Sequence, residues 1–386
     1  MRRLILLASA LIFFDVAFFS AIAPLLPEYA EDLGLTKTEV GVLSASYAAG
    51  TLLFSLPAGF VASRAGPRRT VISGLLLLGC TSVVFGFAEH IVLLDGARFV
   101  QGAAGALIWS GALTWLITNA PDENRGAIVG SALGTAIVGA LFGPVLGAAA
   151  GSVGTAPIFS LVLGITLVLA YIAAKTPEKR APERQSLGQV LRTLVSRPLL
   201  EVAAFVAVPS VMFGAIEVLV PLRIDSLGGG HLVIAAGFIV GAALEASLAP
   251  VAGRLSDKVG RRTPYVIGLA ICSVSMAALA VVGTLGGVLG GLVLTSMGAG
   301  LCFAPVLTLI SEVAEGSGLH QGFASGVSNI AWASGQVIGG VGGGVVATYE
   351  GYALPSLAIA ALLAVTGVYA YRAMEAEGRA RPAPTI

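Results

Sequence analysis

Four ionisable residues interrupt long apolar runs of this sequence. Asp15, Glu217 and Glu245 are acidic, and Arg98 is basic. A charged side chain in such a run is costly unless it faces water, a partner or a bound molecule. A carboxyl group held there is suited to proton exchange, whereas an arginine stays charged and needs an acidic or carbonyl partner. We therefore expect proton-linked binding at these residues, with Arg98 paired to Asp15; Asp95 is a weaker partner near the end of its run.

The composition places these residues in a membrane protein. Of 386 residues, 56% are hydrophobic and only 11% are charged, with a net charge of +1. Soluble domains carry about 25% charged residues, so that class is excluded. The hydrophobicity excludes a disordered chain, and the charge balance excludes a basic nucleic-acid binder. Twelve spanning helices of roughly 20 residues would use most of the chain.

The apolar runs predict an all-α membrane protein with twelve transmembrane helices. Alternation typical of a β-barrel is absent. The apolar stretch before Ala8 is too short for a cleaved signal peptide, so the first run is interpreted as an uncleaved span. The expected helices are 4–27, 40–62, 70–88, 92–118, 126–150, 155–174, 199–222, 232–255, 264–283, 286–311, 322–347 and 353–372.

A polar segment at 175–198 divides six predicted spans from six. The expected domains are 1–174, a cytoplasmic linker at 175–198 and 199–386, with a short amphipathic helix near Leu187–Leu194. With the N-terminus inside, 19 of the 22 Lys and Arg residues fall on the inner side. This bias predicts that both termini are cytoplasmic.

The two halves of the sequence repeat each other. Segment 58–70 aligns with 252–264, which is an offset of 194, and the same offset places 21–27 on 215–221 and 33–34 on 227–228. Parallel six-helix repeats without an ATP-binding segment are typical of secondary transporters whose site lies between the halves. We expect two pseudo-symmetric bundles.

Two loops of the repeat resemble the Gly-x-x-x-Asp-Arg/Lys-x-Gly-Arg-Arg/Lys motif of the major facilitator superfamily. The basic residues are expected to pair with a neighbour's carboxylate or carbonyls and so hold one conformation, or else only to set topology. Gly59 and Gly253 should permit close helix contact, and Gly66 and Gly260 should allow the chain to turn. In the first copy, Ser63 replaces the acidic residue of the motif. The matching residues are Gly59, Arg64, Gly66, Arg68 and Arg69, then Gly253, Asp257, Lys258, Gly260, Arg261 and Arg262.

Three further motifs resemble those of twelve-helix drug:proton antiporters, including tetracycline exporters and vesicular amine transporters. They are Asp15-x8-Pro24-x2-Pro27, Arg98-x2-Gln101-Gly102 and Gly139-x3-Gly143-Pro144-x2-Gly147. Glu217 before Pro221 is similar to the acidic seventh helix of the amine transporters. Asn329 lies where their eleventh helix carries an acid, so monoamine specificity is not supported. Glu245 is interpreted either as a cavity acid or as a packed, protonated residue.

The resemblance implies a proton-coupled antiporter of the plasma (inner) membrane that works by alternating access. We expect it to export small amphiphilic, cationic or weakly basic compounds, because acids outnumber Arg98 among the membrane residues. The expected partners are substrate, protons and lipid; we expect a monomer with no cofactor, metal or enzymatic activity. Alternatives are transport of a neutral metabolite such as a sugar, or a receptor or lipid-handling protein on the same scaffold. Single aromatics that could line the cavity, or simply pack, are Phe18, Tyr47, Trp109, Trp115 and Trp332.

Overall fold

The computed structural model describes residues 1–121, 125–178, 187–319 and 321–380, and every regular element in these ranges is helical. The elements are α1 (Arg2–Ser20), η1 (Ala23–Leu25), α2 (Leu26–Asp32), α3 (Lys37–Ala65), α4 (Pro67–Gly86), α5 (Ile91–Asn119), α6 (Arg125–Val153), α7 (Thr155–Lys175), α8 (Leu187–Leu194), α9 (Arg197–Ser226), α10 (His231–Val259), α11 (Arg262–Val281), α12 (Leu285–Gly316), α13 (Gln321–Glu350) and α14 (Ala353–Ala380).

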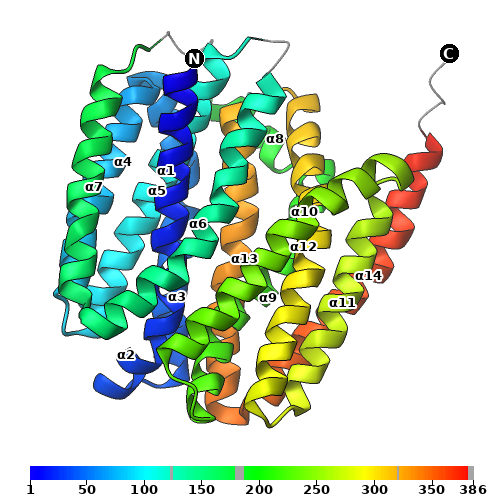
Figure 1. The fold of residues 1–386 in the computed structure, drawn as a ribbon. Coiled ribbons are helices and arrows are strands. Elements are labelled where there is room, and N and C mark those ends of the chain that lie inside the picture. Colours follow the sequence, from blue (N-terminus) through cyan, green and yellow to red (C-terminus); the bar gives the residue numbers. More distant parts are fainter. Residues whose placement is uncertain (122–124, 179–186, 320, 381–386) are drawn as a thin grey trace.

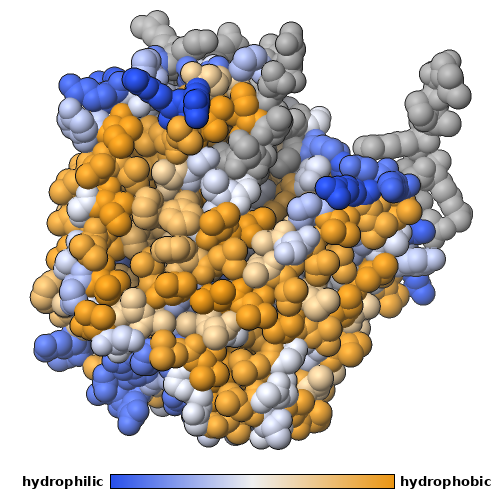
Figure 2. All heavy atoms as spheres, in the orientation of Figure 1, coloured by the Kyte–Doolittle hydropathy of each residue, from blue (hydrophilic) through white to orange (hydrophobic). Residues whose placement is uncertain are grey.

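Twelve of the helical stretches are long and apolar enough to cross a membrane, which confirms the predicted fold class. Figure 2 shows a broad apolar band between two hydrophilic ends of the molecule. The start of α1, the end of α14 and α8 lie at one end, and α2 lies at the other (Figure 1). We call these the linker end and the far end. The helix expected near Leu187–Leu194 is present as α8, whereas the proposed domain limits stay a prediction.

The first span departs from the prediction of one helix over 4–27. The helix α1 ends at Ser20, and the chain continues through η1 into α2. Pro24 lacks the N–H group that would bond to the Ser20 carbonyl four residues earlier, and its ring crowds that carbonyl. The last carbonyls of α1 are therefore left without partners inside the helix. This break creates acceptors within the membrane region.

Glycines in the left-handed region confirm the internal repeat. Gly34 and Gly228 have φ angles of 63° and 84°, and Gly66 and Gly260 have φ angles of 90° and 82°. Each pair is separated by 194 residues, and each ends a corresponding helix or turn. A residue with a Cβ atom is strained in this conformation, so glycine is required at the same points of both halves.

A second repeated feature is the packing of glycine stripes on the first helix of each half. Side chains at the glycines of α6 would overlap α1 backbone or side-chain atoms, and those of α13 stand in the same relation to α9. The glycines of the α6 motif therefore allow close contact with the helix that carries Asp15 and fix its position. The pairs are Gly139–Phe13, Gly143–Ala17 and Gly147–Ala21, then Gly335–Ala207, Gly339–Val211 and Gly343–Ala215.

The two halves meet along α3 and α13 at both ends of the molecule. At the far end the Lys37 ammonium donates to the Ala347 carbonyl at 3.1 Å. Towards the linker end the Phe60 and Phe323 rings lie 5.1 Å apart. Close passage is possible because Gly41 lies directly against the Gly340 backbone, where a side chain would overlap it.

On the other side of the molecule, α6 and α10 meet towards the far end. The Ser152 hydroxyl lies 3.1 Å from the His231 ring. The two helices separate towards the linker end (Figure 1). A side chain at Gly134 or Gly253 would meet no atom of the described residues within 4 Å. The close helix contact expected at Gly253 is thus wrong in this conformation, while Gly59 does pack against Phe323, as expected.

The contact at Gly41 gives a test of far-end closure. We expect Gly41→Leu to separate α3 from α13, because the added side chain occupies the space of the Gly340 carbonyl. In a cysteine-free background carrying Thr38→Cys, labelling by a membrane-impermeant maleimide should rise several-fold. Gly96→Leu is the matched control, since no atom lies within 4 Å of a side chain there. Equal labelling in the two variants would contradict the closure.

Candidate functional site

Arg98 caps the broken end of α1. Its side chain is 2% exposed, and its guanidinium donates to the carbonyls of Phe18 at 3.4 Å and Phe19 at 3.2 Å. These carbonyls belong to the last turn of α1, which lacks intrahelical partners and carries the negative end of the helix dipole. The ion pair expected between Arg98 and Asp15 is not formed. The carbonyl alternative is found instead, because the Pro24 break makes these acceptors available.

Asp15 is held by two donors from neighbouring helices. The Tyr47 hydroxyl of α3 donates to Oδ1 at 2.9 Å, and the Trp109 indole of α5 donates to Oδ2 at 2.8 Å. The carboxyl group is 2% exposed. The absence of a side chain at Gly105 leaves room for both Asp15 and the Tyr47 hydroxyl. Two donors aimed at two oxygens stabilise a carboxylate without a direct ion pair.

Tyr47 joins the two charged groups. The Arg98 guanidinium lies 5.0 Å from the centre of the Tyr47 ring, within the range of a cation–π contact. Gln101 accepts from Arg98 at 3.4 Å and donates to the Ser82 hydroxyl at 3.3 Å. Within the described ranges, the Nε atom of Arg98 is buried and has no hydrogen-bond partner. Predicted residues Asp15, Arg98 and Gln101 therefore belong to one cluster.

The second half approaches this cluster through α9 and α13. The Trp332 ring of α13 meets Phe19 edge-on at 5.2 Å. Glu217 of α9 is partly buried and lies within electrostatic range of Arg98. No hydrogen bond to Glu217 is found among the described residues. Gln336 of α13 is 4% exposed, and its Oε1 atom has no partner among those residues either.

Within the described part of the chain, no hydrogen bond or ion pair joins the other predicted cavity residues to the cluster. Glu245 of α10 is partly buried, and its backbone lies where a side chain at Gly300 of α12 would be placed. Asn329 is partly buried on α13, less than one turn before Trp332. Their roles stay predictions.

The side chains of two aromatic residues considered from the sequence lie outside the cluster. Trp115 donates to the Pro177 carbonyl at 3.1 Å near the linker end. Phe18 is buried and stacks on Phe14 at 6.2 Å. The sequence did not identify Tyr47 and Trp109 as the partners of Asp15, because residues 32 and 94 positions away leave no local spacing to find.

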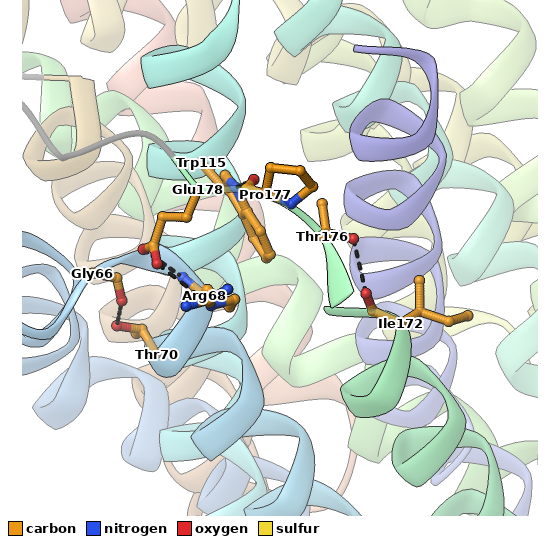
Figure 3. Close-up of polar contacts among 8 residues, drawn as sticks. All are labelled: Gly66, Arg68, Thr70, Trp115, Ile172, Thr176, Pro177 and Glu178. Atoms are coloured by element: carbon orange, nitrogen blue, oxygen red, sulfur yellow. Dashed lines mark hydrogen bonds and ion pairs between the residues drawn. The ribbon is translucent and has the colours of Figure 1, made fainter. Parts of the chain in front are cut away.

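The first basic motif finds its carboxylate outside the motif. The Arg68 backbone N–H donates to Glu178 Oε1 at 3.1 Å, and its Nε lies 3.5 Å from Oε2. Figure 3 shows Glu178 reaching from the segment after α7 to the start of α4. The sequence suggested that the first motif lacks an acid, because Ser63 stands in its place. Glu178 supplies that acid from outside the motif. Arg64 lies 6.0 Å from the Phe60 ring, and Arg69 is exposed.

The second motif is also completed by a distant acid. Arg261 binds both oxygens of Glu312 on α12, with one contact of 2.7 Å. Arg262 lies 4.5 Å from the Tyr371 ring. Asp257 and Lys258 are exposed. Both ion pairs join parts of the same half, so in this conformation they brace each half and do not tie the halves together.

The geometry can hold a cation or a proton beside aromatic rings, next to the surface where the halves meet. No group of three or more potential metal ligands is found among the described residues. The arrangement that decides the family is the repeated six-helix pattern with glycine-terminated loops at both corresponding positions. A model of the Major Facilitator Superfamily matches residues 5–340 and 233–385. The chain belongs to this superfamily, and it is a multi-pass membrane protein.

Several curated or solved proteins are similar to this superfamily member. The MFS-type transporter ppzB of Metarhizium rileyi (strain RCEF 4871) is 28% identical over 135 residues, covering 34% of this chain and 28% of the relative. The uncharacterized MFS-type transporter YcaD of Escherichia coli O139:H28 (strain E24377A / ETEC) is 26% identical over 269 residues, covering 67% and 68%. The chain spans 28% and 21% of the first two curated relatives, both ppzB proteins.

A solved structure shares the fold over nearly the whole chain. It is a bacterial homologue of the human lysosomal transporter Spinster in an inward-facing, occupied conformation. Its TM-score is 0.80 at 14% identity, and the match covers 99% of this chain and 98% of that one. At this identity the likeness shows the fold alone.

The donors to Asp15 can be tested by chemical labelling. Dicyclohexylcarbodiimide reacts with protonated carboxyl groups in membranes. We expect Tyr47→Phe to raise labelling of Asp15 several-fold at neutral pH, because a donor to the carboxylate is lost. Mass spectrometry of the Asp15 peptide measures this. Tyr171→Phe, an exposed residue of α7, is the control. Unchanged labelling in Tyr47→Phe would show that its hydroxyl does not stabilise the ionised group.

Proposed function

We propose that this major facilitator protein is a proton-coupled antiporter that exports small amphiphilic, cationic or weakly basic compounds. The observation that supports it most strongly is the position of Asp15. Its carboxyl group is held by Tyr47 and Trp109, while the charge of Arg98 is taken up by the end of α1. The acid is therefore not consumed by an internal ion pair and is available to a cationic ligand.

The surroundings of Asp15 favour an amphiphilic cation. Tyr47 and Trp109 contact the acid directly, and Phe19 joins Tyr47 to Trp332 of the other half. Aromatic faces bind organic cations by cation–π attraction, and their apolar area suits a hydrophobic body. The buried Oε1 atom of Gln336 adds an acceptor for a substrate N–H group.

Asp15 and Glu217 have different roles in this proposal. Asp15 has two fixed donors and binds the substrate cation as a carboxylate. Glu217 lacks such donors among the described residues and faces the charge of Arg98 across the interface of the halves. Glu217 is the group that exchanges the coupling proton. A proton on Glu217 and a cation at Asp15 then compete, because each adds a positive charge to the same site.

Alternating access follows from the contacts between the halves. The far end is closed by Lys37, Ala347, Ser152 and His231, whereas α6 and α10 separate at the linker end. With the linker end cytoplasmic, as the charge bias predicts, this conformation receives substrate from inside. Substrate binding at the cluster shifts Phe19 and Trp332, which belong to opposite halves. The rocking motion then opens the far end and releases substrate outside the plasma membrane.

The proposal is tested by transport into inverted vesicles with an imposed pH gradient, using ethidium as a lipophilic cation. We expect Asp15→Asn to abolish exchange and binding, because the substrate's counter-charge is lost. Glu217→Gln should keep substrate counterflow but lose accumulation driven by the pH gradient. Asp95→Asn is the control, since this half-buried acid contacts Ser46 at the far end. Intact drug/proton exchange in Asp15→Asn would disprove the role of Asp15 as the counter-charge of the substrate.

One observation favours a second candidate. The unpartnered Nε of Arg98 is a buried donor that fits an anionic group. A zwitterionic amphiphile would use Asp15 and Arg98 together. Such a transporter would lose its preference for zwitterions over simple cations in Arg98→Gln, measured by competition in the same vesicles.

A further inference from the structure

A cavity of about 570 Å³ lies between α9 and α14, apart from the transport site. Along α9 its lining residues recur at helical spacing, so they form one stripe of the helix. Val365 is 68% exposed and Leu200 is 54% exposed, although both are apolar and lie in membrane-spanning helices. The cavity is therefore a groove that opens towards lipid. Its lining from α9 is Arg197, Leu200, Glu201, Ala204, Phe205 and Val208.

The polar side chains of the groove are concentrated at its linker end. Arg197 begins α9, and Glu201 follows one turn later. The Tyr369 hydroxyl of α14 donates to Oε1 of Glu201, which leaves the other carboxylate oxygen available. The described residues provide no ion-pair partner for Arg197. The Ser196 hydroxyl beside it is buried and has no hydrogen-bond partner there. The groove thus presents separate anion-binding and cation-binding groups side by side.

The length of the groove fits one lipid leaflet. From Arg197 to Val208 the stripe rises by about 16 Å at 1.5 Å per residue. Half of a hydrocarbon core of about 30 Å is nearly the same length. An acyl chain lying along Leu200, Phe205 and Val208 would therefore place its headgroup at Arg197 and Glu201.

We propose that this groove binds a phospholipid with a primary-amine zwitterionic headgroup, namely phosphatidylethanolamine. Its phosphate accepts from Arg197, and its ammonium donates to the free oxygen of Glu201. Phosphatidylcholine offers the same phosphate, but its quaternary ammonium has no N–H to donate. Phosphatidylglycerol carries net negative charge next to Glu201. The preference therefore depends on Glu201 and the strength of binding on Arg197.

The test is native mass spectrometry of the delipidated full-length chain with the three lipids, each carrying identical palmitoyl and oleoyl chains. We expect phosphatidylethanolamine to bind about tenfold more tightly than phosphatidylcholine, the ratio for one charge-assisted hydrogen bond. Glu201→Gln should bring this ratio close to one while phosphatidylcholine binding persists. Arg197→Gln should weaken binding of all three lipids. Asp225→Asn, an exposed acid at the other end of α9, is the control and should keep the ratio.

Three results would overturn the proposal. Equal binding of the ethanolamine and choline lipids to the unmodified chain would remove the headgroup preference. A preference that survives Glu201→Gln would place the lipid elsewhere. Strongest binding of phosphatidylglycerol would show that basic residues alone attract lipid. Retained phosphatidylcholine binding shows that Glu201→Gln is folded, and an unchanged elution volume on size-exclusion chromatography shows it for every variant, so each result decides the matter.

Discussion

A guanidinium buried among apolar helices must find its acceptors within the protein. In this chain the acceptors for Arg98 are the carbonyls of Phe18 and Phe19, and they exist because α1 stops early. Pro24 causes that stop, since it cannot donate to the carbonyl of Ser20. The proline, the helix end and the arginine therefore form one arrangement. Its result is that Asp15 remains free of an internal cation.

The same broken helix is where the two halves influence each other. On one side α1 is fixed by the glycine stripe of α6, which allows backbone contact without side chains between. On the other side Phe19, whose carbonyl holds Arg98, meets Trp332 of α13. A change of charge at the cluster thus acts on a residue that bridges the halves. Because packed interfaces have discrete alternative arrangements, a small shift here can favour one of two rigid-body states.

Much of the fold could be predicted from the sequence because apolar length and positive charge are local properties. Eleven of the twelve spans and α8 were located from the sequence, and the repeat offset of 194 placed Gly34 and Gly66 on Gly228 and Gly260. The prediction of a single helix for the first span was wrong, because a proline can either end a helix or be accommodated within it. Only the surrounding packing decides between these outcomes.

The site was predictable only as a set of residue types. The cost of burying a charge identified Asp15 and Arg98 as site residues. The predicted ion pair between them assumed that opposite charges on adjacent helices must meet. Backbone carbonyls and an intervening tyrosine satisfied both groups instead. Glu178 and Glu312 were missed for a related reason. Each lies far from its arginine in sequence, and a single acid outside a motif carries no local sign of its partner.

The central claim is that Asp15 is kept as an available counter-charge for a cation that displaces a proton from the same site. The most direct measurement is proton release from the purified protein when tetraphenylphosphonium binds, followed with a pH indicator in weakly buffered detergent solution. The account predicts proton release by the unmodified chain, and neither binding nor release in Asp15→Asn. Cation binding without proton release by the unmodified chain, or unchanged release in Asp15→Asn, would contradict it.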